Sequence, residues 1–215
     1  MAVSTDTMMS LADVLSHVPG IAPERIRLHP VPGTATEADV EGIHVREKRR
    51  FELFDGILVE KSMGYRESAF ACALIRILHE FVTLRNLGII SGESGTMRFF
   101  PGLVLIPDVA FVSWARVPGG KFPIEPIPNL VPDLAIEVLS SSNTPVEMRR
   151  KREEYFRAGV TLVWEIDPEK RTLVRYTDPE SSQLFQEDAV VSGEPALPGF
   201  SLNLAELFSE LDRIA

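Results

Sequence analysis

The chain has 215 residues, with 22 lysines and arginines against 31 aspartates and glutamates, which gives a formal net charge of −9. Hydrophobic residues make up 45% and charged residues 25%, so the sequence predicts a folded protein with a sizeable core and excludes global disorder. The acidic balance disfavours a general nucleic-acid binder, whose footprint is normally a basic patch, although residues 46–50 and 149–152 are locally basic.

The targeting and redox features predict a cytoplasmic protein without a membrane partner. The apolar runs are far shorter than a bilayer span, and residues 1–20 lack the basic start and apolar centre of a signal peptide. Cys72 is the single cysteine, which excludes an intramolecular disulfide and fits a reducing compartment. The four histidines are scattered without the spacing of a zinc site.

The N-terminal part of the chain predicts an arm with one short helix. Ser10 can cap a helix over 10–17, and the prolines and glycines of 19–42 predict irregular structure. We therefore divide the chain into an N-terminal arm, 1–45, and one domain, 46–215.

The first half of the predicted domain alternates between strands and one long helix. Residues 51–62 predict a hairpin around Asp55-Gly56, and apolar residues at helical spacing predict a helix over 65–86. Three strands are then expected, at 88–95, 96–100 and 104–113. The proline-rich loop 115–130 is long enough to indicate a functional or oligomer-contacting segment.

The second half begins with an apolar strand over 134–139 and a charged helix over 146–158 that ends at Gly159. A hairpin over 161–177 and a short amphipathic helix from about Asn203 complete the chain. This order of elements predicts an α/β (α+β) fold with a mixed sheet.

Two carboxylates interrupt apolar strand patterns, and each is costly to bury unless a cation neutralises it. Glu137 lies within the strand 134–139, and Asp108 lies within 104–113. Adjacent strands are only ~4.8 Å apart, so these two acids can face each other and share a Mg²⁺ ion. Asp133 precedes Glu137 by four residues, ~13 Å along a strand, which is too far for a shared ion. The alternative is that the acids are independent and face solvent or arginines.

Lys151 and Glu52 are candidates to complete such a site. Glu147, Lys151 and Tyr155 are spaced by four residues and share one helix face, where an ammonium could orient water and stabilise developing negative charge. A solvated helix face is the alternative for Lys151. Glu52 alternates with Phe51 in the hairpin and points either into the same site or to the surface.

Several motifs together resemble the Uma-type family of restriction-endonuclease-like proteins, in the PD-(D/E)XK nuclease superfamily. They are FELFDGILVEK, PDVAFV, PDLAIEVLSSSN, and a K-x-x-x-Y pattern followed by AGVTLVWEIDP. The resemblance covers roughly 48–178 and implies a restriction-endonuclease-like mixed central β-sheet flanked by helices, with a divalent metal held by two carboxylates.

The resemblance also implies a role for each candidate residue. Asp108 matches the aspartate of the PD element and Glu137 the acid of the (D/E)XK element. The superfamily lysine would fall at Leu139, and the resemblance instead indicates Lys151 on the following helix. Glu52 matches the recurring acid of the first hairpin, as an additional metal ligand or a supporting residue.

These roles imply a DNA endonuclease, a hydrolase that uses Mg²⁺ or Mn²⁺. Asp108, Glu137 and the main-chain carbonyl of Val138 would hold the metal, and Lys151 would position the attacking water. Cleavage of both DNA strands needs two sites, which predicts a homodimer with its contact near the N-terminal arm or the loop 115–130. The alternatives are an inactive nuclease-fold module that binds protein or nucleic acid, and a hydrolase of small phosphoesters.

Overall fold

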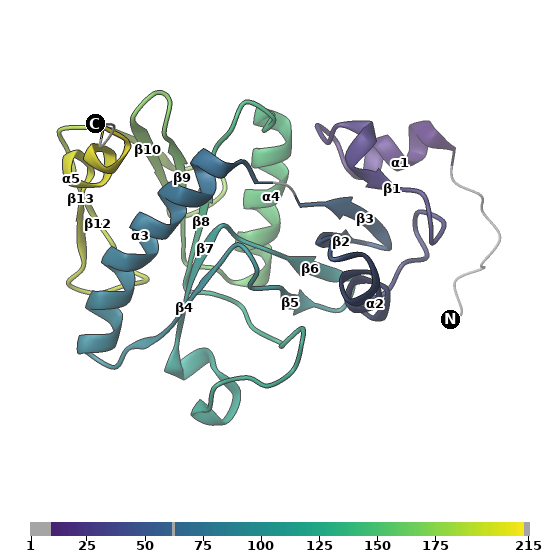
Figure 1. The fold of residues 1–215 in the computed structure, drawn as a ribbon, viewed down its shortest axis with the longest axis horizontal. Helices are drawn as coiled ribbons and strands as arrows, with labels where there is room; N and C mark the ends of the chain where they lie inside the picture. Colours follow the sequence, from purple (N-terminus) through teal and green to yellow (C-terminus); the bar gives the residue numbers. More distant parts are fainter. Residues whose placement is uncertain (1–9, 62, 213–215) are drawn as a thin grey trace.

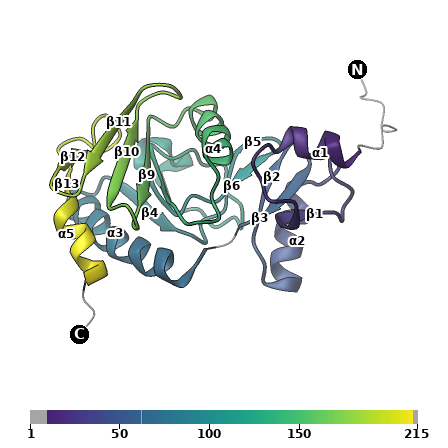
Figure 2. The same cartoon turned by 90° about the horizontal axis from the view of Figure 1, so that it is seen from above.

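A six-stranded sheet forms the centre of the computed structural model, which describes residues 10–61 and 63–212. The strands lie in the order β11-β10-β9-β8-β7-β4. Figure 1 labels the strands from β10 to β4, and Figure 2 labels β11 beside β10. β8 and β9 are parallel and the other neighbouring pairs are antiparallel, so the sheet is mixed, as predicted. The strands are β4 (Gly88–Gly92), β7 (Val109–Ser113), β8 (Leu134–Val138), β9 (Leu162–Asp167), β10 (Thr172–Tyr176) and β11 (Ser182–Gln186).

Five short strands form a second, antiparallel sheet in the order β1-β3-β2-β6-β5. The predicted hairpin supplies β2 and β3, and both residues of its Asp55-Gly56 turn have positive φ. These strands are β1 (Ile26–Arg27), β2 (Phe51–Phe54), β3 (Ile57–Glu60), β5 (Met97–Phe100) and β6 (Leu103–Leu105). A two-stranded pair, β12 (Val190–Ser192) and β13 (Ser201–Asn203), lies near the C-terminus.

The helices α3 (Tyr65–Leu84) and α4 (Pro145–Ala158) lie on opposite faces of the central sheet (Figure 2). Strand side chains alternate between faces, and every second one packs with α3 and α5 (Leu204–Ser209). The residues of the strands on that face are Val109, Phe111, Leu134, Ile136, Val138, Leu162, Trp164 and Ile166.

The opposite face carries the smaller residues Ala110, Val112, Ala135 and Val163, which pack in one cluster with Tyr155 of α4 and with the second sheet. Asp108 and Glu137 fall on this face by the same alternation, because each lies an even number of positions from these alanines. The fold therefore directs both acids toward α4.

Residues 104–113 do not form the single strand that the apolar pattern predicts. They contribute to β6 and β7, which belong to different sheets, and Ile106, Pro107 and Asp108 connect the two. Proline has no N–H to donate to a strand ladder, which accounts for the break at Pro107. The consequence is that Asp108 lies where the two sheets meet.

The N-terminal part is more regular than predicted. The helix α1 (Leu11–His17) begins at its Ser10 cap as expected. The prediction of irregular structure over 19–42 is wrong in part, because this range contains a 3₁₀ turn (Pro23–Arg25), β1 and the start of α2 (Glu37–Glu47). The expected division between 45 and 46 falls inside α2, and the separate arm remains a prediction.

The segment before α2 is fastened to the start of α4. Thr144, the N-cap of α4, donates its hydroxyl to the carbonyl oxygen of Gly20 at 2.9 Å. Arg25 forms an ion pair with Glu147 at 2.8 Å, and Val14 packs in the same apolar cluster as α4. These contacts hold the start of α4 in place, and Glu147 lies one helical turn before Lys151.

The remaining predicted elements are confirmed. α4 ends at Gly159, whose φ of 98° is in the left-handed region, and Asn203 caps α5 through its side chain. The loop 115–130 contains parts of two 3₁₀ turns, at Trp114–Arg116 and Pro118–Gly120, and another 3₁₀ turn, Glu210–Asp212, follows α5. None of the described helices is both long and apolar enough to cross a membrane.

Candidate metal and catalytic site

The two acids that interrupt the strand pattern face each other across β7 and β8. The antiparallel register pairs Val109 with Ile136, which brings the preceding Asp108 beside the following Glu137. Both side chains are buried, with exposed fractions of 3% and 4%. Asp108 Oδ2 accepts the main-chain N–H of Val138 at 2.7 Å, so its orientation is fixed by β8 itself.

Helix α4 supplies a cation and a phenol to Glu137. Lys151 Nζ lies 2.9 Å from Glu137 Oε1 and also 2.9 Å from Glu52 Oε1. The hydroxyl of Tyr155, one turn further along α4, donates to Glu137 Oε1. Glu52 Oε1 additionally accepts the N–H of Ile106 at 3.0 Å. The structure therefore brings Glu52, Glu137 and Lys151 together, and none of them is a surface residue.

A second lysine, Lys61, lies in the site, although the sequence pattern does not single it out. Its Nζ is 2.7 Å from Asp108 Oδ1 and 3.3 Å from Glu137 Oε2. Lys61 directly follows β3, and its main-chain N–H donates to the carbonyl of Arg50 at 3.0 Å. The only sequence signal for it is a lone lysine at the end of the apolar strand ILVE, which is normally a solvated position.

Burial and the neighbouring charges shift the pKa values of these groups in different directions. Burial raises the pKa of Asp108, and Lys61 offsets this only in part. Burial acts in the same sense on Glu137, but Lys151 and Lys61, helped by the Tyr155 hydrogen bond, outweigh it and lower the pKa of Glu137. Burial also opposes the charge of Lys61, yet Glu137, Asp108 and Glu52 together hold its pKa well above the ordinary value.

Burial and the Glu137 carboxylate both raise the pKa of Tyr155 well above its usual value. Tyr155 is therefore a neutral hydrogen-bond donor throughout the physiological range, while Glu137 is an anion.

The oxygens left over for a metal ion are Asp108 Oδ1 and Glu137 Oε2. Their partner oxygens are engaged by Val138, Lys151 and Tyr155, whereas these two share one contact, the Lys61 ammonium. Among the described residues, no three carboxylate, imidazole or thiol groups are arranged around one point as metal ligands. Mg²⁺ often uses only one or two carboxylates plus waters, so a cation-binding pair of hard oxygens fits it.

Asp133 is confirmed to lie outside this pair. Its Oδ2 accepts the N–H of Ser113 at 2.7 Å, and its Oδ1 lies 2.8 Å from Arg116 Nε. Asp133 therefore fixes the entry of β8, as expected for an acid at that distance from Glu137.

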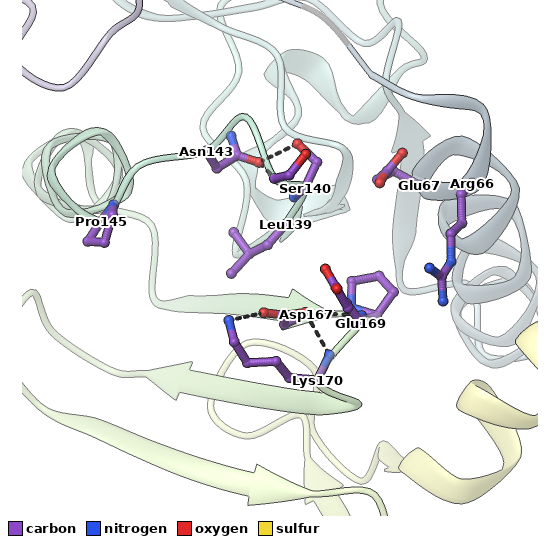
Figure 3. Close-up of a pocket in the computed structure, with 11 residues that line it drawn as sticks. Arg66, Glu67, Leu139, Ser140, Asn143, Pro145, Asp167, Glu169 and Lys170 are labelled. Carbon is purple, nitrogen blue, oxygen red and sulfur yellow. Dashed lines mark hydrogen bonds and ion pairs between the residues drawn. The ribbon is translucent and has the colours of Figure 1, made fainter.

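A cavity of about 520 Å³ lies beyond the end of β8, starting at Leu139 (Figure 3). The turn of Ser140 and Asn143, which are hydrogen-bonded to each other, lines one side. Arg66 of α3 lines the other, and it forms no ion pair within the described part of the chain. Lys170 also lines this space, but Asp167 pairs with its ammonium at 2.5 Å.

The mixed sheet, with helices on both faces and an acid pair at the junction of two sheets, defines a nuclease-like α/β architecture. A family model for Uma2, described as "Putative restriction endonuclease", matches residues 38–205. The chain belongs to this family, which confirms the resemblance seen in the sequence.

Among solved structures, the chain is similar to a putative nuclease belonging to DUF820 from Anabaena variabilis ATCC 29413. The two share 23% identity with a TM-score of 0.67 over 76% of this chain and 92% of that chain, a similarity that establishes the fold. The comparison with curated proteins gives no match. The family match begins inside α2, so α1 and β1 precede it.

Proposed function

We propose that the protein is a divalent-metal-dependent DNA endonuclease that hydrolyses phosphodiester bonds. The observation that supports this most directly is the facing pair of Asp108 and Glu137, with one oxygen of each turned toward a shared cation position. The chain's membership of a restriction-endonuclease-like family supports the same reaction class.

Asp108 and Glu137 would hold Mg²⁺ or Mn²⁺, with the main-chain carbonyl of Val138 as a third ligand. The ion, when bound, lowers the pKa of a coordinated water and offsets the charge of the scissile phosphate. Lys151 positions the attacking water and stabilises negative charge as it develops on the phosphate. Glu52 holds the Lys151 ammonium from the side opposite Glu137, since the same Nζ contacts both carboxylates.

DNA is the substrate that this proposal assigns, and the cavity beside Leu139 is where the strand flanking the scissile bond lies. Arg66, which forms no ion pair with any residue that the structure describes, supplies a cation to that cavity. A homodimer, which would cleave both strands, is also proposed, with its contact at the loop 115–130. The exposed apolar residues Phe122 and Ile124, 70% and 94% accessible, support that location. The free thiol of Cys72 supports a reducing, cytoplasmic environment.

Plasmid cleavage with Mg²⁺ or Mn²⁺ tests the proposal. Wild type should nick or linearise supercoiled DNA, and a chelator should stop the reaction. Asp108→Asn and Glu137→Gln keep the shape of each side chain and should lower the rate by at least about 100-fold. Asp133→Asn is the matched control, an acid-to-amide change at the far end of β8, and should cleave normally.

Equal cleavage by all of these variants would show that the activity belongs to a contaminant or that the site is wrong. If neither the wild type nor any variant cleaves DNA, while all of them still bind DNA in a mobility-shift assay, the protein is a nuclease-fold binding module instead.

A further inference from the structure

The Lys61 ammonium occupies the position in which a divalent ion would meet both carboxylates. It contacts Asp108 Oδ1 and Glu137 Oε2, and the other oxygen of each acid is already used by a neighbour in the fold. A Mg²⁺ ion needs oxygens at about 2.1 Å. An ion bound to these two oxygens and an ammonium hydrogen-bonded to both cannot occupy the same small space.

The two lysines of the site differ in how firmly they are held. Lys151 lies in the middle of α4 and pairs with Glu52 and Glu137 at equal distances of 2.9 Å. Lys61 follows the last residue of β3, with its backbone fixed to Arg50 and one of its two ion pairs longer, at 3.3 Å. A lysine has a flexible four-carbon stem, so the Lys61 ammonium can move without any change in the sheet.

The charge balance favours such a movement when a metal ion arrives. The three carboxylates of Glu52, Asp108 and Glu137 face only two ammonium groups, those of Lys61 and Lys151, which leaves one uncompensated negative charge. A divalent ion added beside both ammonium groups would turn this excess negative charge into an excess positive charge. The excess positive charge is relieved when the less firmly held ammonium moves toward an incoming phosphate anion.

We propose that Lys61 is an exchangeable cation of the site: its ammonium bridges Asp108 and Glu137 before metal binds, and then moves to a non-bridging oxygen of the scissile phosphate. This inference rests on the proposed metal-dependent function. It assigns Lys61 two opposing effects, since the residue competes with the metal for its ligands and assists the reaction once the metal is bound.

Calorimetric titration with Mn²⁺ alone, in mildly alkaline buffer that keeps both acids ionised, tests the competition. Lys61→Met should bind Mn²⁺ about tenfold tighter than wild type or better, because a competing positive charge is removed. Lys48→Met, which removes an exposed lysine outside the site and its cavity, should match wild type. Asp108→Asn should lose binding. At saturating Mn²⁺, Lys61→Met should cleave plasmid at least about tenfold more slowly than wild type.

A second measurement uses the folded wild-type protein. The Lys61 ¹⁵Nζ resonance, assigned by its absence from Lys61→Arg, should shift on addition of Mg²⁺, while the resonance of the exposed Lys48 stays in place. Unchanged or weaker Mn²⁺ binding by Lys61→Met, or an unmoved Lys61 resonance while Asp108→Asn still loses Mn²⁺ binding, would overturn the exchange and leave the metal site intact. Absence of Mn²⁺ binding by both wild type and Lys61→Met would overturn the exchange and the proposed function together.

Discussion

Replacing Lys151 with methionine tests whether the buried charges balance one another. The Lys151 side chain is only 5% exposed, and its ammonium is the shared partner of Glu52 and Glu137 at 2.9 Å each. Methionine fills much of the same volume but leaves two buried carboxylates without this cation. Breaking a buried pair in this way costs about 3–5 kcal/mol of unfolding free energy. Urea unfolding followed by far-UV circular dichroism measures that loss.

The companion change Glu52→Gln separates charge from packing. Glutamine still accepts the Ile106 N–H, so the double variant loses one charge of each sign and keeps that hydrogen bond. The double-mutant cycle should give a coupling energy of about 2–3 kcal/mol between Glu52 and Lys151. A loss below about 1 kcal/mol for Lys151→Met, or strict additivity within about 0.5 kcal/mol, would refute the reasoning.

The pH dependence of the same variant has a defined sign. In the wild type, burial raises the pKa of Glu137 but Lys151 and Lys61 outweigh it, so the pKa is lowered. A lowered pKa stabilises the fold above the unfolded pKa, and that contribution is lost as pH falls through the folded value. Without Lys151, one of the two charges that lower the pKa of Glu137 is lost. Burial, which raises that pKa, then has the larger share of the effect. The stability deficit of Lys151→Met should therefore be largest near neutral pH and shrink toward acid.

Four further changes test the surroundings of the site and the proposed dimer contact. Gly20 has a φ of +79°, and a Cβ there would lie 2.6 Å from the main-chain nitrogen of Glu147 in α4 and from the hydroxyl of its N-cap Thr144, so Gly20→Ala should cost about 2–3 kcal/mol in urea unfolding. Gly159→Ala is the comparison, since Gly159 also has a positive φ but has open space around it, and it should cost about 1 kcal/mol. Equal losses of stability in Gly20→Ala and Gly159→Ala would contradict the close packing of Gly20 against the start of α4. Asp133→Asn should lower stability by about 1 kcal/mol, and a loss of cleavage by it would place catalysis elsewhere on β8. Phe122→Ser combined with Ile124→Ser should convert a dimer to a monomer by light scattering, and an unchanged mass would exclude this loop as the contact.

The sequence predicts the central sheet well because its inner strands are short continuous apolar runs, the pattern of strands that are buried on both faces. β7, β8 and β9 each carry apolar residues on both faces, and only Asp108, Glu137 and Glu165 break the pattern near the site. Strand spacing makes it feasible for Asp108 and Glu137 to face each other, and the register of β7 against β8 brings them together. The short exposed strand β11 (Ser182–Gln186) was missed because its residues are mostly exposed and polar, which gives no periodic signal.

Two other features of the structure are not predicted from the sequence, the first for a local reason and the second because of tertiary structure. The start of α2 was missed because the prolines and glycines before it dominate the local pattern, although Thr36 and Asp39 form a capping box there. Lys61 is not identified from the sequence because its partners lie far along the chain, Asp108 just before β7 and Glu137 in β8, at the other sheet. A lysine at a strand end acquires a role only when the two sheets meet.

The charged residues lie at the junction of the two sheets and α4, where apolar packing would be at least as stable. Ion pairs taken out of water cost desolvation energy that their attraction seldom exceeds. Glu52, Glu137 and Lys151 nevertheless come from three separate elements to one point, each more than nine-tenths buried. Stability alone does not account for that choice of residues, which is the arrangement that the proposed cation binding and phosphate chemistry require. The Arg25–Glu147 pair adds to this, since it fixes α4 one turn from Lys151 and so holds the ammonium against its two carboxylates.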